Sequence, residues 1–151
     1  MIYELAKLEE LQAVYDVVQQ TIKTIYPKYY PMEVVDFFCQ HHSRDAIAED
    51  IKNGYVSVLK IDGTIIATGS FMDNHITRVY VLPKYQKKGY GTYIMKNIED
   101  QIGEKYDKAY VDASLPAAAL YEKPGFVTVN HQRYLVENEV VLAYEVMEKK
   151  I

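Results

Sequence analysis

The amino-acid sequence predicts an α/β fold of the α+β kind, with a mixed, mostly antiparallel sheet of six to seven strands and helices on both faces. Two turn signals, Asp62-Gly63 and Asp73-Asn74, separate three strand-like segments and indicate an antiparallel meander. The helical pattern that starts at Tyr90 lies between two strand-like segments, and this crossover is typical of parallel neighbours. The chain has 151 residues, 49% hydrophobic and 25% charged, without a composition shift, so one domain over residues 1–151 is expected.

The N-terminal third is expected to hold one strand and three helices. Apolar residues recur at helical spacing from Leu8 to Tyr26, and two prolines then bracket a tight connection. Ser43 is a good N-cap for the third helix, and Asn53-Gly54 supplies a left-handed stop. The expected segments are a strand over Ile2 to Leu5 and helices over Leu8 to Tyr26, Met32 to His41 and the residues between Ser43 and Asn53.

The rest of the chain reads as six strands with two helices inserted. Pro83 has no amide for a sheet ladder and therefore ends the third strand of the meander. Ile94, Ile98 and Ile102 keep helical spacing in the central helix that begins at Tyr90. A short helix is expected from Pro116 to Lys123. The expected strands are Tyr55 to Ile61, Thr64 to Phe71, Ile76 to Leu82, Lys108 to Ala113, Val127 to Val136 and Val140 to Met147.

The loop Gln86-Lys-Lys-Gly-Tyr-Gly91 joins the last strand of the meander to the central helix. Its glycines permit a tight turn and leave room for a ligand. The first amides of the helix have no internal partners, and the helix dipole places positive charge there beside two lysines. Such a site favours a phosphate or pyrophosphate. The alternative is an ordinary strand-to-helix turn with a solvated lysine pair.

Charge and composition narrow the classes of partner. A net charge of −4 gives no broad basic field and disfavours nucleic acid. No apolar run approaches membrane-spanning length, and the N-terminus lacks the regions of a signal peptide, so no membrane partner and a cytoplasmic location are expected. The single cysteine, Cys39, has no partner for an internal disulfide. No spacing resembles a zinc motif, and the adjacent His41 and His42 diverge on a helix, so no metal is expected.

A second motif, Leu120-Tyr-Glu-Lys-x-Gly-Phe126, follows the loop along the chain. Together with Val79-Tyr-Val81, Pro83 and Gln86-x-x-Gly-x-Gly91, it resembles the GNAT superfamily of N-acetyltransferases over about Ile76 to Phe126. The resemblance implies a GNAT-like sheet, acetyl-CoA as cosubstrate, and direct transfer of the acetyl group to a primary amine in a ternary complex. No covalent enzyme intermediate is required.

The resemblance also implies roles for individual residues. Tyr121 would be the general acid that protonates the leaving thiolate, because a phenol stays protonated at neutral pH; the alternative for Tyr121 is core packing. Ser114 falls where many relatives carry an asparagine that contacts the cofactor. The implied cofactor-binding residues are Val79, Tyr80 and Val81 for the pantetheine arm and the acetyl carbonyl, and Gln86, Lys87, Lys88, Gly89, Tyr90, Gly91 and Thr92 around the pyrophosphate, besides Ser114.

The general base is less well indicated. His75 is the best titratable candidate, because the unperturbed pKa of histidine lies near neutrality. The alternative is a strand-end histidine whose bonds are made with nearby backbone. Some relatives that modify protein N-termini carry a glutamate at the position that matches Ala109. The alanine in this chain cannot serve as the general base. Asp73 and Asp112 are weaker candidates, and a water chain without a dedicated base also remains open.

The acceptor is expected between the N-terminal helices and the hairpins. Tyr29 and Tyr30, on the proline-bracketed loop, are candidate substrate-binding residues. The acidic balance favours a cationic small molecule such as a polyamine or aminoglycoside, and a peptide amine also stays open. A homodimer through the exposed edge of the closing hairpin is a further candidate. The alternative functions are a coenzyme A-binding regulatory module without transferase activity and an ordinary nucleotide-binding domain, but the phosphate-binding motif of the latter is missing.

Overall fold

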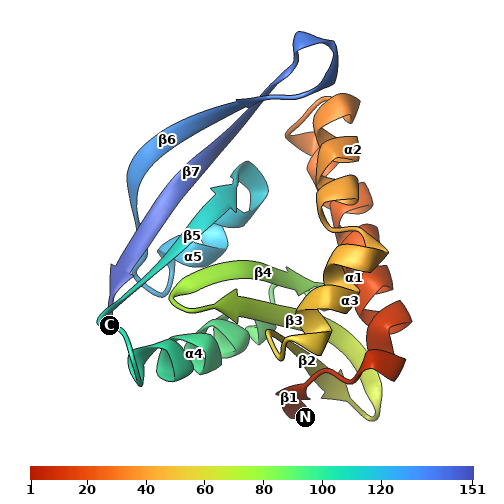
Figure 1. Cartoon of the computed structure of the whole chain (residues 1–151), viewed down its shortest axis with the longest axis vertical. Coiled ribbons are helices and arrows are strands. Elements are labelled where there is room, and N and C mark those ends of the chain that lie inside the picture. Colours follow the sequence, from red (N-terminus) through yellow and green to blue (C-terminus); the bar gives the residue numbers. More distant parts are fainter.

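A computed structural model describes the whole chain, residues 1–151, as a seven-stranded mixed sheet with helices on both faces (Figure 1). All neighbouring strands are antiparallel except β4 and β5, so the predicted mixed, mostly antiparallel sheet is confirmed. In sheet order the strands are β1 (Ile2–Leu5), β2 (Val56–Ile61), β3 (Thr64–Met72), β4 (His75–Val81), β5 (Lys108–Ser114), β7 (Val141–Lys150) and β6 (Val127–Leu135). The helices are α1 (Leu11–Ile25), α2 (Met32–His41), α3 (Arg44–Lys52), α4 (Tyr90–Gly103) and α5 (Ala118–Glu122).

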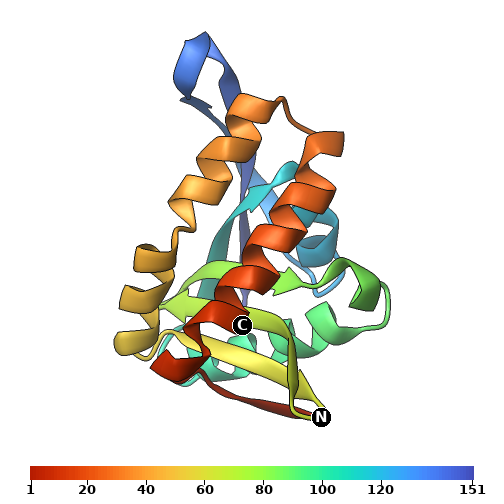
Figure 2. The ribbon, with the colours of Figure 1, turned by 90° about the vertical axis from the view of Figure 1, so that its right-hand side faces the viewer.

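Two buried clusters hold the layers together, one on each face of the sheet. Helices α1 to α3 cover one face and stand in front of the sheet in Figure 2. Val14 and Ile47 of these helices belong to the same buried cluster as Tyr80 of β4. On the other face, Ile94 and Ile98 of α4 are fully buried against the sheet. The four-residue spacing of these α4 side chains puts them on one side of the helix, which is why this segment packs as predicted. No helix is both long and apolar enough to cross a membrane.

The helix caps and turns predicted from the sequence are present in the structure, and the boundaries of some helices and strands differ by a few residues. The hydroxyl of Ser43 accepts a hydrogen bond from the amide of Ala46 and caps α3. Asp62 and Gly63 both have positive φ, 50° and 78°, as a tight hairpin turn requires. The short helix expected from Pro116 is a 3-10 turn over Leu115–Ala117 followed by α5, and Pro116 lies in the first turn, where an amide would have no partner within the helix.

Strands β4 and β5 pair only where they begin and then diverge, as Figure 1 shows. The parallel ladder consists of His75 with Tyr110 and Ile76 with Val111. The cause lies in the next residue, because the β3–β4 register passes from Ser70–Arg78 to Phe71–Ile76 and leaves Thr77 as an extra residue on β4. A bulge of this kind bends a strand and increases its twist. The carboxyl half of β4 therefore has no partner strand on the side of β5.

Candidate active site

A cavity of about 570 Å³ lies beside the carboxyl end of β4. Its walls come from the open half of β4, the loop and first turn of α4, and α5 with the turn before it. Lys88 is the one predicted loop residue outside the lining, and its ammonium lies 5.8 Å from the centroid of the Tyr85 ring. The predicted cofactor-binding residues that line the cavity are Val79, Tyr80, Val81, Gln86, Lys87, Gly89, Tyr90, Gly91 and Thr92.

The start of α4 presents unpaired amides to this cavity. Gly89 is the N-cap residue, has φ +88° and carries no side chain that caps the helix. The first amides of the helix therefore have no partner in the chain and face the cavity with the positive end of the dipole. Lys87 and Lys123 add positive charge to the lining. This wall of the cavity is suited to an anion such as a pyrophosphate.

The side chain of Gln86 has a role that the sequence did not indicate. Its amide Nε2 donates to the carbonyl of Val81 at 2.9 Å, and the hydroxyl of Thr21 donates to the same carbonyl at 3.3 Å. The glutamine thus ties the loop to the end of β4 and holds the helix start beside the strand. Because Gln86 and Val81 are five residues apart within a turn, no periodic pattern in the sequence predicts their contact.

Tyr121 lies in a second, smaller cavity of about 50 Å³ between the diverging strands. The side chain is buried, and its hydroxyl has no hydrogen-bond partner in the chain. Burial raises the pKa of Tyr121, and the neighbouring Tyr26 raises it further, so the phenol is a neutral proton donor. Tyr26, Val79, Tyr80 and Ala117 line both cavities, so the two cavities are neighbours at Val79 and Tyr80 of β4.

A network of hydroxyl groups crosses the gap between β4 and β5. The hydroxyl of Tyr26 shares a hydrogen bond of 3.2 Å with that of Tyr80 and one of 2.9 Å with that of Ser114. Burial raises the pKa of Tyr80 well above its usual value, and Tyr26 adds to this effect. The predicted cofactor contact Ser114 therefore lies on the small cavity with its hydroxyl bonded to Tyr26.

His75 lies outside both cavities, at the paired beginning of β4. Its ring stacks on Tyr110 with centroids 4.3 Å apart, and its Nε2 is 3.4 Å from the carboxylate of Asp112. Burial lowers the pKa of His75, and the charge of Asp112 opposes this shift. Asp112 does line the small cavity, so it links His75 to the site.

The two tyrosines predicted to bind the acceptor have different surroundings, and neither lines the large or the small cavity. Tyr29 is exposed, whereas Tyr30 is buried. The hydroxyl of Tyr30 accepts from the amide of Leu115 at 2.7 Å and donates to the carbonyl of Ala143 at 2.9 Å. The substrate role of both residues stays a prediction. No group of three or more His, Cys, Asp or Glu side chains is placed to hold a metal ion.

Comparisons with known proteins agree with this geometry. The model of a family described as acetyltransferase (GNAT) domain matches residues 25–145. The catalytic subunit NAA20 of the N-terminal acetyltransferase B complex of Arabidopsis thaliana is 36% identical over 73 residues, which cover 44% of this chain and 41% of that relative. The match thus spans less than half of the curated relative.

Two solved structures share the fold over nearly the whole chain. A GCN5-related N-acetyltransferase from Rhodopseudomonas palustris superimposes with a TM-score of 0.91 at 20% identity, covering 99% of this chain and 95% of the other. The PaiA N-acetyltransferase from Thermoplasma acidophilum, solved in complex with coenzyme A, gives a TM-score of 0.77 at 18% identity, covering 99% and 98%. At these identities the likeness shows a common fold.

Proposed function

This chain belongs to the GNAT acetyltransferase family, and from that premise we propose that it transfers an acetyl group from acetyl-CoA to a primary amine in a ternary complex. One observation supports this most directly: the large cavity joins the unpaired amides of α4 to the open half of β4, and the small cavity reaches the same strand at Val79 and Tyr80. A cosubstrate and an acceptor can therefore approach one strand from two cavities.

The residues of the large cavity fit coenzyme A. The uncapped start of α4, with Gly89 at the N-cap, suits the pyrophosphate. The edge of β4 from Val79 to Val81 that faces away from β3 has no partner strand and suits the amides of the pantetheine arm. The complex of the Thermoplasma protein with coenzyme A supports this assignment. When bound, acetyl-CoA supplies the activated acetyl thioester.

The chain contributes stabilisation and proton transfer to the reaction. The acceptor nitrogen forms a bond to the acetyl carbon while the carbon–sulfur bond breaks, and unpaired amides of β4 stabilise the charge that develops on the carbonyl oxygen. The hydroxyl of Tyr121 donates a proton to the departing sulfur. Cys39 has no part in this scheme, because it lies on α2 outside both cavities.

The amine must lose a proton before or during the attack. His75, the predicted base, does not reach the cavities, so a proton would pass to it through Asp112, 3.4 Å away, or through water. We assign His75 the role of proton acceptor by this relay. The acceptor itself is a small-molecule or peptide amine, and the N-terminal acetyltransferase named above supports the peptide class. A cytoplasmic location and a homodimer through the edge strand β6 are part of the proposal.

The experiment that tests this function is a calorimetric titration of the purified protein with acetyl-CoA, with ATP as the control nucleotide. We expect binding of acetyl-CoA and none of ATP, followed by release of free thiol when amines are added. Equal binding of both nucleotides, or none of acetyl-CoA, would refute the proposal. Binding without thiol release from any amine would instead favour the regulatory module.

A further inference from the structure

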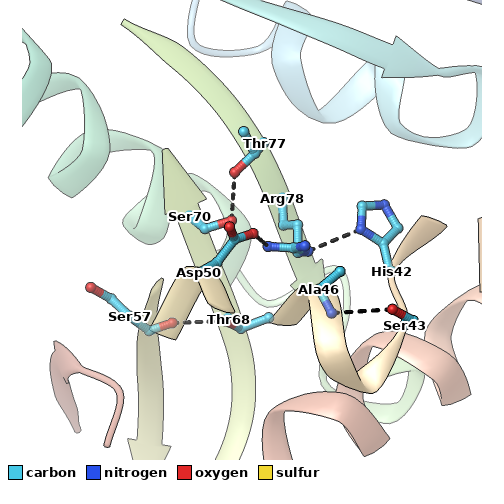
Figure 3. Close-up of polar contacts among 9 residues, drawn as sticks. All are labelled: His42, Ser43, Ala46, Asp50, Ser57, Thr68, Ser70, Thr77 and Arg78. Atoms are coloured by element: carbon cyan, nitrogen blue, oxygen red, sulfur yellow. Dashed lines mark hydrogen bonds and ion pairs between the residues drawn. The ribbon is translucent and has the colours of Figure 1, made fainter. Parts of the chain in front are cut away.

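A buried cationic side chain, that of Arg78, lines the small cavity beside the open half of β4. Arg78 lies on β4 directly before Val79, has only 6% of its surface exposed, and lines this cavity together with His42 and Tyr121. Figure 3 shows its guanidinium between Asp50 of α3 and His42, which ends α2. A buried arginine next to the segment that would hold the acetyl group is placed to contact the acceptor.

The hydrogen bonds of Arg78 leave part of its guanidinium unused. Its Nε donates to Nδ1 of His42 at 2.9 Å, and its Nη1 pairs with the carboxylate of Asp50 at 2.5 Å. The third nitrogen, Nη2, has no acceptor in the chain. No enclosed polar side-chain atom lacks a partner, so Nη2 keeps some exposed surface, and the residue to which it belongs lines the small cavity. An arginine so placed can bind a further oxygen.

His42 adds a second donor with a fixed orientation. Its Nδ1 accepts from Arg78 and therefore carries no proton, so the neutral ring has its proton on Nε2. Burial and the charge of Arg78 keep the pKa of His42 well below its usual value, which favours this neutral form. Nε2 has no partner in the chain and, like Nη2 of Arg78, is not enclosed. Both groups can donate to the same ligand.

Size and charge restrict what this cavity can accept. A volume of about 50 Å³ has room for only a few atoms the size of water. Asp50 balances the charge of Arg78, and the remaining donors favour an oxygen acceptor. A second ammonium group, as in a polyamine or aminoglycoside, would instead be repelled by the positive charge of the guanidinium.

We propose that Arg78 and His42 orient the acceptor by donating hydrogen bonds to one of its oxygen atoms. This oxygen is bonded to the carbon adjacent to the one that carries the amine. The acceptor is therefore an α-amino carbonyl compound, which is either a free amino acid or the first residue of a peptide. This inference rests on the acetyltransferase function proposed above and specifies its substrate class.

Three acceptors of similar size test the inference through thiol release: L-alanine, the peptide alanyl-glycyl-glycine, and isopropylamine, which has the same branched carbon and no oxygen. A preference for alanine would identify a free amino acid, and a preference for the tripeptide would identify a polypeptide N-terminus. Each is also titrated by calorimetry into the protein with and without coenzyme A, so binding is measured even without turnover.

The decisive comparison uses Arg78→Met combined with Asp50→Asn, which removes both members of the buried ion pair. Asp50→Asn alone is the matched control, because the guanidinium stays and the amide oxygen can still accept from it. We expect KM for the preferred oxygen-bearing acceptor to rise roughly 10- to 100-fold in the double variant and to change little in the control. KM for isopropylamine should stay within about twofold in both.

Equal losses for all three acceptors, or the same loss in the control as in the double variant, would overturn the inference and leave Arg78 a structural role. The titration with acetyl-CoA separates this failure from that of the proposed function. A protein that binds acetyl-CoA and acetylates isopropylamine as well as alanine keeps the function and loses the inference. If no thiol is released, unaltered alanine and tripeptide binding in the double variant refutes the inference by itself.

Discussion

Two buried tyrosines, Tyr121 and Tyr30, illustrate at the residue scale how burial alone leaves the role of a hydroxyl open. The hydroxyl of Tyr30 joins the amide of Leu115 to the carbonyl of Ala143, whereas that of Tyr121 has no partner in the chain. Burial raises the pKa of Tyr30 to about 12 and also raises that of Tyr121, so both are neutral at physiological pH. Only Tyr121 is free to give its proton to a ligand.

We therefore expect Tyr121→Phe to lower turnover by roughly 10²–10⁴-fold, the range for a lost general acid, while acetyl-CoA affinity and the melting temperature change little. Tyr30→Phe should show the reverse, with a loss of about 1–2 kcal/mol in the free energy of unfolding and nearly normal kcat. Steady-state kinetics and thermal melts on both variants make the comparison. Unchanged turnover in Tyr121→Phe would assign this residue to packing.

His42 should make stability depend on pH in a predictable direction. Burial and Arg78 hold its pKa well below the usual 6.5, so below that pH the unfolded chain binds a proton that the folded chain does not. The free energy of unfolding should then fall as pH drops below 6.5, by up to about 1.4 kcal/mol per pH unit for this group.

The variant His42→Asn can still accept from Arg78 and has no proton to gain. Denaturant titrations between about pH 8 and pH 5 should show a shallower decline for this variant, by roughly 1–2 kcal/mol in total. His131→Asn is the control variant, because it also removes one histidine ring but at an exposed position. His41 and His75, whose pKa values burial also lowers, cancel in this comparison. Parallel curves for His42→Asn and the wild type would contradict the prediction.

At the scale of the element, the start of α4 depends on one backbone conformation. Gly89 has φ +88°, and a Cβ placed there would meet no atom within 4 Å. Gly63, in the β2–β3 turn, has φ +78° and equally open surroundings, so it is a matched control. Leucine at either position should cost about 1–2 kcal/mol of stability through the left-handed backbone.

Only Gly89→Leu should also weaken acetyl-CoA binding, by at least about tenfold, because the side chain would stand beside the amides that receive the pyrophosphate. Calorimetric titration of both variants measures this difference, and circular dichroism checks that both remain folded. Equal acetyl-CoA affinities in Gly89→Leu and Gly63→Leu would show that the pyrophosphate does not bind at the start of α4.

The same elements show which structural features a sequence can predict. Caps and turns depend on neighbouring residues, so Ser43, Asp62-Gly63 and the strand end at Pro83 were predicted correctly. The bulge at Thr77 depends on the register between β3 and β4, which no local pattern encodes, although it is what separates β4 from β5. The Arg78–His42 contact likewise joins residues far apart in the sequence, so no local pattern could predict a role for His42.

At the scale of the whole molecule, the sheet consists of two parts that share a short seam. Strands β1 to β4 and strands β5 to β7 are joined in the ladder only through the pairs at His75 and Ile76. The large cavity crosses this seam, since its walls come from β4 and α4 on one side and from the turn before α5, with α5 itself, on the other. A ligand that fills the cavity therefore contacts both parts and binds only the folded chain.

Acetyl-CoA should accordingly stabilise the molecule as a unit. A ligand at about 100 times its dissociation constant adds roughly 2.7 kcal/mol to the free energy of unfolding, which for a chain of this size raises Tm by about 5–10 °C. Thermal melts with acetyl-CoA and with ATP measure the effect, and ATP should produce no rise. Hydrogen exchange should slow in both β4 and α5, because both elements line the cavity that the ligand fills. Slower exchange confined to α4 would mean that the ligand contacts one part alone, and the cavity would then not join the two parts of the sheet.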